Sequence, residues 1–404
     1  MSLEFTEKNL NEIYSITSGL SKSSEEFGFG FPFLSFKTIF YNYYIDKDLN
    51  ELVNSTEEEQ KKHSVKKGDV FLTRTSETLD ELGMSCVALK DYPNATFNGF
   101  TKRLRPKKDK VIYPLYACYY FRSPLFRKYV DSMAIMTTRA SLNNNILSKL
   151  PIIFPNYEYQ KKIGHLLHNL DKKIELNKEI NKNLFNIASS LQTDWMINFT
   201  PFKSKEFKSS FFGLIPEDWN VGKLGDVIEL LDSKRIPISG QKRENMEKIY
   251  PYYGAASLMD YVDDYIFDGI YLLMGEDGTV IDEKGFPILQ YVWGKFWANN
   301  HAHILKGKNG FNVDSLYLFL SKTNIQSIVT GAVQAKVNQS NLKSIEIIIP
   351  PVEVMNEFNE LIKPFFDAIR SNHDEIEKLQ KLRDTLLPKL MSGEIDVSKI
   401  NCDL

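Results

Sequence analysis

The chain has 404 residues, of which 43% are apolar and 25% charged, and its formal net charge is −2. This length suffices for two or three domains with cores of their own, and the near-neutral charge excludes a histone-like binder while leaving room for a local basic face. No apolar run approaches the ~18 residues of a membrane span, and the N-terminus lacks a signal pattern. We therefore expect a soluble, cytoplasmic protein.

The N-terminal region predicts a mixed α/β domain, which we place at residues 1–153. Residues 68–75, GDVFLTRT, follow a turn and alternate like a half-buried strand. Residues 114–133 carry apolar and aromatic side chains at helical spacing, with a break near Pro124. The β-branched run that stops at Pro155 predicts a buried strand ending in an abrupt turn.

A long helix follows, in a central spacer that we place at residues 154–200. Apolar residues from Ile163 to Trp195 recur every three or four positions, and neither proline nor glycine follows Gly164 in this stretch. At ~1.5 Å per residue the helix would extend about 60 Å, which is typical of a coiled coil. Its expected coiled-coil and partner-docking positions are Leu170, Ile174, Asn177, Leu184 and Leu191.

The second domain, which we place at residues 201–348, follows a polar linker. It opens with a turn, a tryptophan anchor at Trp219 and a short helix. Several of its segments correspond in order to segments of the first domain. These are LGDVIEL (224–230) with LNEIYSI (10–16), DGIYLLMG (268–275) with GDVFLTRT (68–75), and FWANNHAHIL (296–305) with TFNGFTKRL (96–104).

An ungapped repeat supports the correspondence between the two domains. RASLNNNILSKLPIIFP (139–155) aligns with QAKVNQSNLKSIEIIIP (334–350) at a constant offset of 195 residues, and a long helical segment follows each copy. A repeat of this length indicates a duplicated domain and hence pseudo-two-fold symmetry. Such symmetry suits a two-fold partner, of which duplex DNA is the commonest.

The C-terminal region, residues 349–404, predicts a second long helix at about 352–391. Its expected coiled-coil positions are Ile369, Asn372, Ile376, Leu379 and Leu386. Asn372 matches Asn177 by the same offset, and buried asparagines can fix the register of a coiled coil. A position at the edge of the coil, where polar residues are tolerated, explains the two asparagines equally well. The predicted class is α+β: two mixed α/β domains and two helices in an antiparallel coiled coil, a pseudo-two-fold dumbbell.

Catalytic signatures are missing from the sequence. It contains no phosphate-binding GxxxxGK[ST], no GxGxxG that opens a helix, no HExxH and no Asn-Pro-Pro-aromatic tetrapeptide. Three cysteines without a CxxC pair fit a reduced protein without structural zinc, and a zinc site at His301 and His303 would need partners that the sequence does not reveal. The acidic pair Glu276-Asp277 is explained by a solvated turn. We expect neither a catalytic centre nor a bound metal or cofactor.

Residues suited to reading nucleic acid occur in register in both copies. Arginine pairs well with guanine edges, asparagine and glutamine pair with adenine, and basic clusters contact phosphates. Next to the repeat, the candidates are Arg139, Ser141, Asn143 and Asn145 in the first copy and Gln334, Lys336 and Asn338 in the second. Further candidate DNA contacts are Arg74, Lys102, Arg103, Arg105, Lys107, Lys234, Arg235, Lys242, Arg243, Asn300 and His301.

Four segments resemble the specificity (S) subunit of type I restriction-modification systems, and the resemblance covers essentially the whole chain. They are QKKIGHLLHNLDKKIELNKEI (160–180), GLIPEDWNVGKLGDV (213–227), FWANNHAHIL (296–305) and KLRDTLLPKLMSGEIDV (381–397). The resemblance implies two target recognition domains, each reading half of a split, asymmetric site in double-stranded DNA. One departure is that the N-terminal half lacks an IPEDW-like lead before Leu10, which leaves the start of the first domain open.

The resemblance also implies roles for the helices and for other proteins. Two spacers would form an antiparallel coiled coil that sets the half-site separation, near one turn or about 10 base pairs, and docks two modification subunits. Restriction subunits can join. S-adenosylmethionine, ATP and magnesium would serve those partners rather than this chain.

Two other interpretations remain open. A coiled-coil adaptor without DNA specificity explains the long helices but not the two register-matched Arg/Asn/Gln-rich segments. A fragment of a fused restriction-methylation enzyme would require the catalytic tetrapeptide that is missing here.

Overall fold

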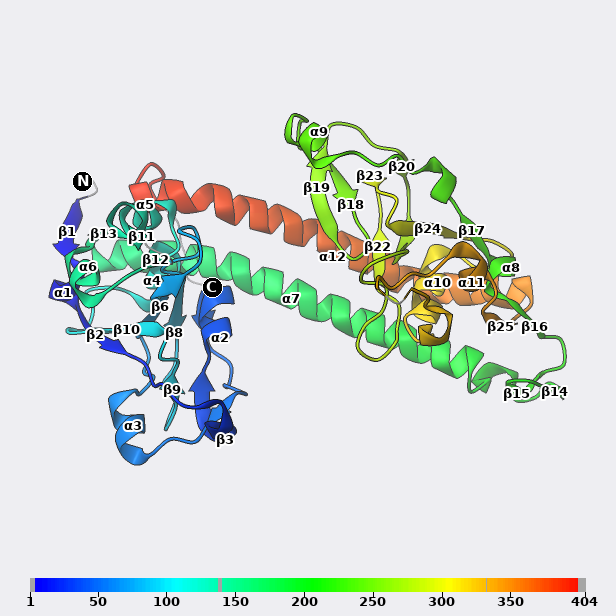
Figure 1. Ribbon diagram of the computed structural model, residues 1–404, viewed down its shortest axis with the longest axis horizontal. Coiled ribbons are helices and arrows are strands. Elements are labelled where there is room, and N and C mark those ends of the chain that lie inside the picture. Colours follow the sequence, from blue (N-terminus) through cyan, green and yellow to red (C-terminus); the bar gives the residue numbers. More distant parts are fainter. Residues whose placement is uncertain (1–3, 137–139, 332, 399–404) are drawn as a thin grey trace. The chain divides into compact units, whose positions relative to one another are not determined.

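The computed structural model describes residues 4–136, 140–331 and 333–398 (Figure 1). They form two compact units, the first comprising Met1–Leu176 with Glu375–Leu404 and the second comprising Asn177–Asp374. Each unit combines short strands and helices with about half of each long helix, α7 (Tyr157–Met196) and α12 (Val352–Ser392). The predicted α+β class with two mixed domains and two long helices is confirmed.

A five-stranded sheet with the order β2-β10-β6-β8-β4 is the centre of the first unit. Strand β10 pairs antiparallel with β2 and β6, and β1 pairs antiparallel with β13. The elements before α7 are β1 (Phe5–Asn9), α1 (Leu10–Ile13), β2 (Tyr14–Ser18), η1 (Ser24–Glu26), β3 (Phe27–Leu34), α2 (Phe36–Tyr41), β4 (Tyr44–Ile45), β5 (Leu52–Val53), α3 (Glu57–Lys62), β6 (Val70–Thr73), β7 (Thr75–Ser76), β8 (Ser85–Ala88), β9 (Thr96–Phe97), β10 (Thr101–Pro106), α4 (Pro114–Tyr120), α5 (Pro124–Met133), β11 (Ile135–Met136), β12 (Ala140–Ser141), α6 (Asn144–Lys149) and β13 (Pro151–Pro155).

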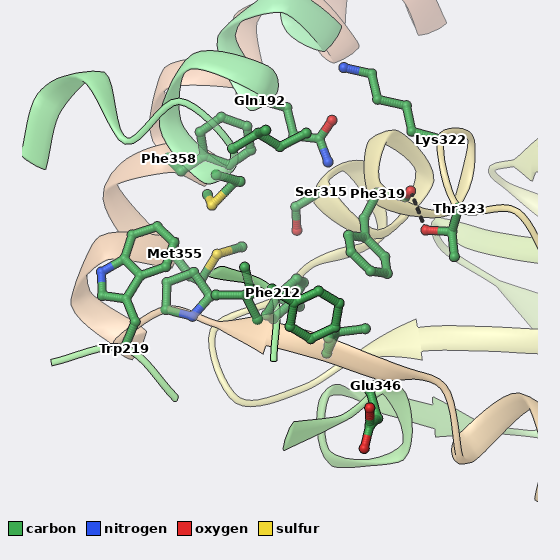
Figure 2. A pocket seen from close by; sticks show the side chains of 16 residues that line it. Gln192, Phe212, Trp219, Ser315, Phe319, Lys322, Thr323, Glu346, Met355 and Phe358 are labelled. Carbon is green, nitrogen blue, oxygen red and sulfur yellow. Dashed lines mark hydrogen bonds between the residues drawn. The ribbon is translucent and has the colours of Figure 1, made fainter. Parts of the chain in front are cut away.

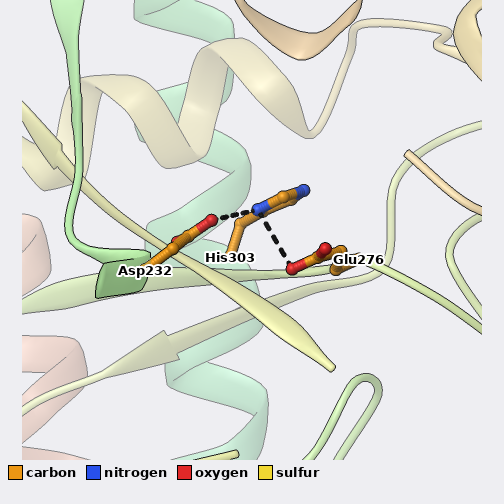
Figure 3. A group of neighbouring side chains, drawn as sticks. All are labelled: Asp232, Glu276 and His303. Atoms are coloured by element: carbon orange, nitrogen blue, oxygen red, sulfur yellow. Dashed lines mark hydrogen bonds and ion pairs between the residues drawn. The ribbon is translucent and has the colours of Figure 1, made fainter. Parts of the chain in front are cut away.

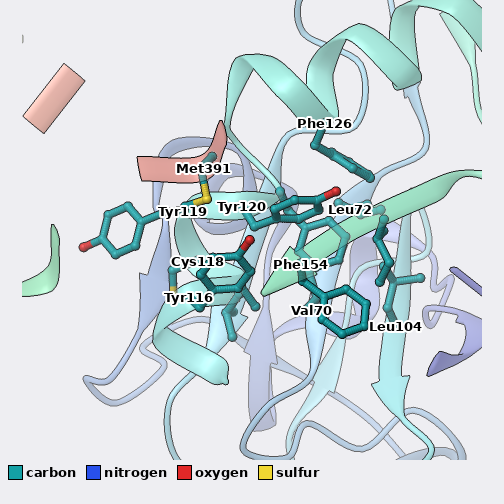
Figure 4. Close-up of a cluster of buried hydrophobic side chains, with 14 of the residues drawn as sticks. Val70, Leu72, Leu104, Tyr116, Cys118, Tyr119, Tyr120, Phe126, Phe154 and Met391 are labelled. Atoms are coloured by element: carbon teal, nitrogen blue, oxygen red, sulfur yellow. The ribbon is translucent and has the colours of Figure 1, made fainter. Parts of the chain in front are cut away.

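Two apolar clusters cover the two faces of β6. Val70 and Leu72 lie in the larger cluster with aromatic side chains of α4 and α5 and with Met391 of α12 (Figure 4). Phe71 lies in a second cluster that includes Phe97. The prediction of a half-buried strand is therefore wrong: all four residues of β6 are buried, because side chains pack on both of its faces. The predicted helical break near Pro124 is confirmed by the start of α5.

The second unit contains two four-stranded sheets, β17-β24-β21-β22 and β19-β18-β23-β20. Trp219 is fully buried, as expected of an anchor. The elements between α7 and α12 are η2 (Thr200–Phe202), β14 (Phe207–Ser210), β15 (Gly213–Pro216), β16 (Asn220–Lys223), α8 (Leu224–Val227), β17 (Ile228–Leu230), η3 (Asp232–Lys234), α9 (Gly240–Glu244), β18 (Tyr250–Tyr253), β19 (Leu258–Val262), β20 (Phe267–Asp268), β21 (Tyr271–Gly275), β22 (Leu289–Val292), β23 (Lys295–Ala298), β24 (Ala302–Gly307), α10 (Val313–Leu320), η4 (Gln326–Ile328), α11 (Gln339–Lys343) and β25 (Glu346–Ile349).

The same topology occurs in both units. The pairs β1–β13 and β16–β25 are both antiparallel, and a one-turn helix, α1 or α8, follows the first strand of each pair. In the sheets, β10 lies between β2 and β6 as β24 lies between β17 and β21. The duplication inferred from the sequence is therefore present in the fold.

Helices α7 and α12 pack antiparallel within each unit. In the first unit Asp171 Oδ1 and Arg383 Nη1 form an ion pair at 2.7 Å. In the second unit Trp195, near the end of α7, lies with its ring centroid 5.6 Å from that of Phe358, near the start of α12. The ten predicted coiled-coil positions are buried or half-buried. Among the described residues, no helix has both the length and the apolarity needed to cross a bilayer.

Candidate nucleic-acid interface

Three segments meet at one end of the central sheet of the first unit. Backbone hydrogen bonds join them, from Arg74 N to Phe100 O (3.1 Å) and from Leu142 N to Arg74 O (2.9 Å). The Asn98 side chain shapes the turn before β10 by accepting a hydrogen bond from Phe100 N at 2.8 Å. We call this arrangement the first junction; it comprises residues 74–76, 98–100 and 140–142.

The second unit contains the same arrangement. Glu276 N donates to His301 O (2.8 Å), and Val337 N donates to Glu276 O (2.8 Å). The Asn299 side chain accepts a hydrogen bond from His301 N at 2.9 Å, as Asn98 does in the first unit. We call this the second junction; it comprises residues 276–278, 299–301 and 334–337.

The two junctions share a backbone but differ in side chains. Thr75 is paired with Ser141, and Asp277 is paired with Lys336 in the same way. The equivalent hydrogen bonds, Arg74 N to Phe100 O and Glu276 N to His301 O, show that Phe100 of the first unit corresponds to His301 of the second and that Arg74 corresponds to Glu276. The repeated frame therefore presents chemically different groups in the two copies.

Aromatic and cationic groups dominate the first junction. Phe100 is 59% exposed, and the Arg74 guanidinium lies 5.8 Å from the centre of its ring. Arg74 Nε is buried and has no hydrogen-bond partner among the described residues. A cleft of about 370 Å³ adjoins the ring and is lined by Phe36, Phe40, Thr75, Ser76, Glu77, Glu81 and Phe100. Such a surface can contact thymine methyl groups and phosphates.

Charged and amide groups dominate the second junction. His301 Nδ1 lies 2.6 Å from Asp277 Oδ1, and Gln334 Nε2 lies 3.5 Å from the same oxygen. Lys336 Nζ lies 3.5 Å from Glu276 Oε1. Because His301, Gln334 and Lys336 are exposed, this surface offers hydrogen-bonding groups of the kind that read base edges.

A buried ionic network lies beside the second junction (Figure 3). The ring of His303 on β24 is fully buried, with Nδ1 2.6 Å from Asp232 Oδ2 and Nε2 2.7 Å from Val337 O. Burial alone would raise the pKa of Asp232, but hydrogen bonds from His303 and from Ile304 N hold that pKa below its ordinary value.

Asp232, Glu276 and His303 offer ligand atoms close enough together to hold a metal ion. Their hydrogen-bonding capacity is already used, however. Arg235 Nη1 donates to Glu276 Oε2 at 2.7 Å, and Gln339 Nε2 donates to Asp232 Oδ2 at 2.6 Å. A divalent ion would have to displace these donors and lie against the positive charge of Arg235, so the geometry favours an ion-pair network over a metal centre.

The first unit has a buried lysine at the strand position of His303. Lys102 Nζ donates to Ser18 Oγ at 2.8 Å, and Lys102 lies opposite Ser18 in the pairing of β10 with β2. Burial, followed by the nearby charge of Arg74, lowers the pKa of Lys102. Both units therefore place a buried amine or imidazole two residues after the tip of the turn.

Other predicted DNA contacts make interactions within the fold. Arg103 Nη1 donates to Ser64 O at 2.6 Å, and burial lowers the pKa of Arg103 to about 10. Arg105 forms an ion pair with Asp69 at 2.6 Å. Arg243 Nε, in the second unit, lies 3.1 Å from Asp260 Oδ2.

The remaining candidates divide between junction and distant positions. Asn143 and Asn338 cap α6 and α11 beside their junctions, and Asn300 directly precedes the tip of the second turn, where its carbonyl accepts from Arg235. Lys107 lies beyond the far end of β10, with Nζ 2.5 Å from Asn11 O. Lys234, Lys242 and Asn145 are exposed. Arg139 lies outside the described residues.

Several junction residues were not predicted from the sequence. Phe100 was not singled out, and Glu276 was attributed to a solvated turn although its side chain is only 16% exposed and pairs with Arg235. The matched asparagines, Asn98 and Asn299, each two residues before a tip, were the available signal.

A cavity of about 250 Å³ lies elsewhere in the second unit, among α7, α10 and the start of α12 (Figure 2). Its lining is mainly apolar and includes Met196, Phe212, Trp219, Met355 and Phe358. It offers few groups that could read nucleic acid, so we do not assign it to the interface.

Comparisons with known proteins identify the family of the chain. The family model described as "Type I restriction modification DNA specificity domain" matches residues 3–186 and 216–381. The chain is 28% identical over 415 aligned residues to the type I restriction enzyme MjaIX specificity subunit of Methanocaldococcus jannaschii, covering 97% of this chain and 93% of that protein. It is 34% identical over 139 residues to a putative specificity subunit of Haemophilus influenzae, S.HindORF215P, covering 34% and 35% of the two chains.

The fold also resembles a solved structure. The crystal structure of a type I restriction-modification S subunit from M. genitalium superposes with a TM-score of 0.57 at 15% identity, over 96% of each chain.

Proposed function

This chain belongs to the family of type I restriction-modification DNA specificity domains, and on that premise we propose that each of its two units reads one half of a bipartite, asymmetric DNA site. In this proposal residues 1–153 and 201–348 are target recognition domains, and residues 154–200 and 349–404 are spacers. The chain is a cytoplasmic, non-catalytic subunit. It assembles with two modification subunits and with restriction subunits, which use S-adenosylmethionine, ATP and magnesium.

One observation carries the proposal: the junctions repeat a hydrogen-bonded backbone and differ in the groups that it presents. Both turns are held by an asparagine side chain, through Asn98 and Asn299. The exposed tips are Phe100 in one unit and His301 in the other. A protein that binds two copies of one sequence would present the same groups twice, whereas a reader of an asymmetric site needs two different surfaces on one frame.

The junction side chains are the favoured base readers. Gln334 and Lys336 are exposed beside His301, and Arg74 adjoins the exposed Phe100. Arg105 and Arg243, by contrast, form ion pairs with carboxylates within their own units. We therefore propose that each stabilises its own domain rather than contacting the DNA.

Helices α7 and α12 are the proposed spacer and docking elements. Their antiparallel contacts include the Asp171–Arg383 ion pair, which Tyr119 extends by donating its hydroxyl to Asp171 Oδ2 at 2.7 Å. This network anchors the helix pair to α4 of the first unit. A helix pair anchored in this way is suited to holding two recognition domains at a fixed separation.

The test is to co-express the chain with its modification subunit, map the methylated motif, and measure binding of the complex to duplexes at one salt concentration. We expect a bipartite motif, and each mismatched base pair in either half should weaken binding by roughly 1–3 kcal/mol. Equal binding to the intact site and to a duplex with both halves scrambled would contradict the proposal and favour a coiled-coil adaptor.

An exchange of domains tests which recognition domain reads which half of the DNA site. Replacing residues 1–153 with the matching segment of a relative should change only one half of the methylated motif, because the second junction is untouched. The reciprocal exchange of residues 201–348 is the matched control. A motif that changes in both halves after either exchange would exclude this division of labour.

A further inference from the structure

The ring of His303 contacts an acceptor at each nitrogen. Nε2 lies 2.7 Å from the carbonyl oxygen of Val337, and Nδ1 lies 2.6 Å from Asp232 Oδ2. A carbonyl oxygen only accepts, so Nε2 carries a hydrogen; an ionised carboxylate also only accepts, so Nδ1 carries one as well. The geometry therefore describes an imidazolium in a fully buried position.

Asp232 supplies the ionised partner that this requires. Its Oδ1 accepts from Ile304 N at 2.9 Å, and its Oδ2 accepts from Gln339 Nε2 at 2.6 Å as well as from His303. Three donors around one buried carboxyl group favour the carboxylate over the acid, and they hold its pKa low despite burial.

The charged neighbours of His303 come from four elements. Besides Asp232 of η3, Glu276 after β21 has Oε2 3.7 Å from His303 Nδ1. Arg235 after η3 contacts both carboxylates, at 2.7 Å from Glu276 and 3.6 Å from Asp232. Lys336 lies 3.5 Å from Glu276, and the exposed His301 pairs with the half-buried Asp277 at the adjoining turn. Without the second ring proton, two carboxylates would face a ring nitrogen that carries a lone pair.

Both ring nitrogens contact groups that build the second junction. Through Val337 O, Nε2 holds the segment that carries Gln334 and Lys336, and Val337 N in turn donates to Glu276 O at 2.8 Å. Through Asp232, Nδ1 is linked to Arg235, whose guanidinium also contacts Ala302 O at 2.6 Å. The segments 334–337 and 276–278 are thus tied to this ring by one and two hydrogen bonds, and residues 299–301 are tied to it through Arg235, which lies 3.3 Å from Asn300 O.

We propose that His303 is a positioning residue whose doubly protonated ring holds the second junction in its reading geometry, so that recognition of one half-site depends on that proton. The inference rests on the proposed function, because it assigns His303 to the half-site read by the second unit. It predicts that the other half-site is independent of this proton, since the first unit has Lys102, paired with Ser18, at the equivalent strand position.

The first measurement concerns the ring itself. In the chain labelled with ¹⁵N-histidine, both nitrogens of His303 should carry protons under the conditions in which the complex binds DNA, and the signals should disappear in His303→Lys. A single protonated nitrogen under those conditions would overturn the proposal.

The second measurement concerns recognition by the complex with the modification subunit. Discrimination at each half-site is the ratio of affinities for the intact duplex and for a duplex with one base pair changed in that half. His303→Gln, which keeps a donor but not the charge, should reduce discrimination at the second unit's half-site at least ten-fold and leave the other unchanged. His303→Lys, which introduces the residue used by the first unit, should restore most of it.

The pH profile separates a positioning role from a purely structural one. When the pH is raised far enough to remove the second ring proton, the wild-type complex should lose discrimination at this half-site alone, and His303→Lys should lose less. In His301→Gln, whatever its discrimination at a single pH, the fall in discrimination with rising pH should persist, which excludes the exposed histidine as its source. A flat wild-type profile would overturn the proposal, as would equal behaviour of the Gln and Lys variants.

Two outcomes distinguish a failure of the proposed function from a failure of the inference about His303. If the wild-type complex discriminates at neither half-site, the proposed function fails. If it discriminates at both and the changes at His303 affect both equally, only this inference fails. If the His303→Gln variant does not assemble with the modification subunit, the pH profile of the wild-type complex and the protonation of its His303 ring still test the proposal.

Discussion

Asn372 Nδ2 donates a hydrogen bond to Asn181 Oδ1 at 2.8 Å, and Asn181 Nδ2 donates to Ile369 O at 3.1 Å. The sequence offset had matched Asn372 with Asn177, which is itself buried. The contact falls one helical turn further along α7 because the offset relates equivalent residues of the two copies, whereas antiparallel packing relates residues that face each other. The polar pair interrupts an apolar stripe and so favours one register.

Breaking this pair from one side should destabilise the chain. Asn372→Leu leaves the half-buried Asn181 Oδ1 without its donor, which should lower the free energy of unfolding by about 1–2 kcal/mol. The double variant, with Asn181→Leu added, should recover much of that loss because two apolar side chains then pack together. Denaturant unfolding of the two single variants and the double variant measures the coupling; strictly additive losses would mean that the asparagines do not act as a pair.

Lys336→Ala tests the second junction. If Lys336 contacts a base edge, the variant should lose roughly 1–3 kcal/mol of binding and relax one position of one half-site. Lys284→Ala, which changes another exposed lysine of the same unit, is the control. Titrations on single-base variants of the site distinguish the roles: a uniform loss on all sequences would indicate a phosphate contact, and no loss would exclude both.

Phe100→Ala tests the first junction. Because the ring is 59% exposed, its removal should shift the melting temperature little while weakening discrimination at the half-site of the first unit. Replacing thymines in that half-site with uracil, which lacks the methyl group, should weaken wild-type binding and affect the variant less. Phe211→Ala removes a ring that is 83% exposed in the second unit and should leave both half-sites unaffected; equal effects of the two variants would contradict the assignment.

Shortening both long helices tests the spacer. Removing seven residues from each, 176–182 and 371–377, shortens the pair by about 10 Å while keeping the heptad pattern. That length corresponds to about 3 base pairs, so methylation mapping should show a shorter gap between half-sites or no modification at all. An unchanged gap would show that the helices do not set it.

Patterned features were the ones that the sequence predicted well. The repeat around Asn143 and Asn338, the helices on either side of Pro124, and the two long helices all rest on periodicity or on internal similarity, and the structure confirms each. The burial of both faces of β6 could not be predicted in the same way, because the side chains that cover Phe71 belong to distant parts of the chain.

The candidate site was predicted less completely because its interactions join residues far apart in sequence. His303 and Asp232 are separated by 71 positions, and no spacing rule connects them. Similarly, Arg103 and Arg105 formed a basic cluster in the sequence, but strand alternation and nearby acceptors placed both in internal hydrogen bonds. A single exposed ring such as Phe100 has no periodicity at all.

The turns before β10 and β24 have an evolutionary consequence. Their shape depends on the asparagine side chain and on backbone hydrogen bonds, to which the tip residue, Phe100 or His301, contributes main-chain atoms, while its ring contacts Arg74 or Asp277 beside the turn. A point substitution at the tip can therefore change the exposed chemistry without refolding the turn. On the proposed function, new target sequences can arise by substitution at such positions while the asparagines that precede them keep the turn.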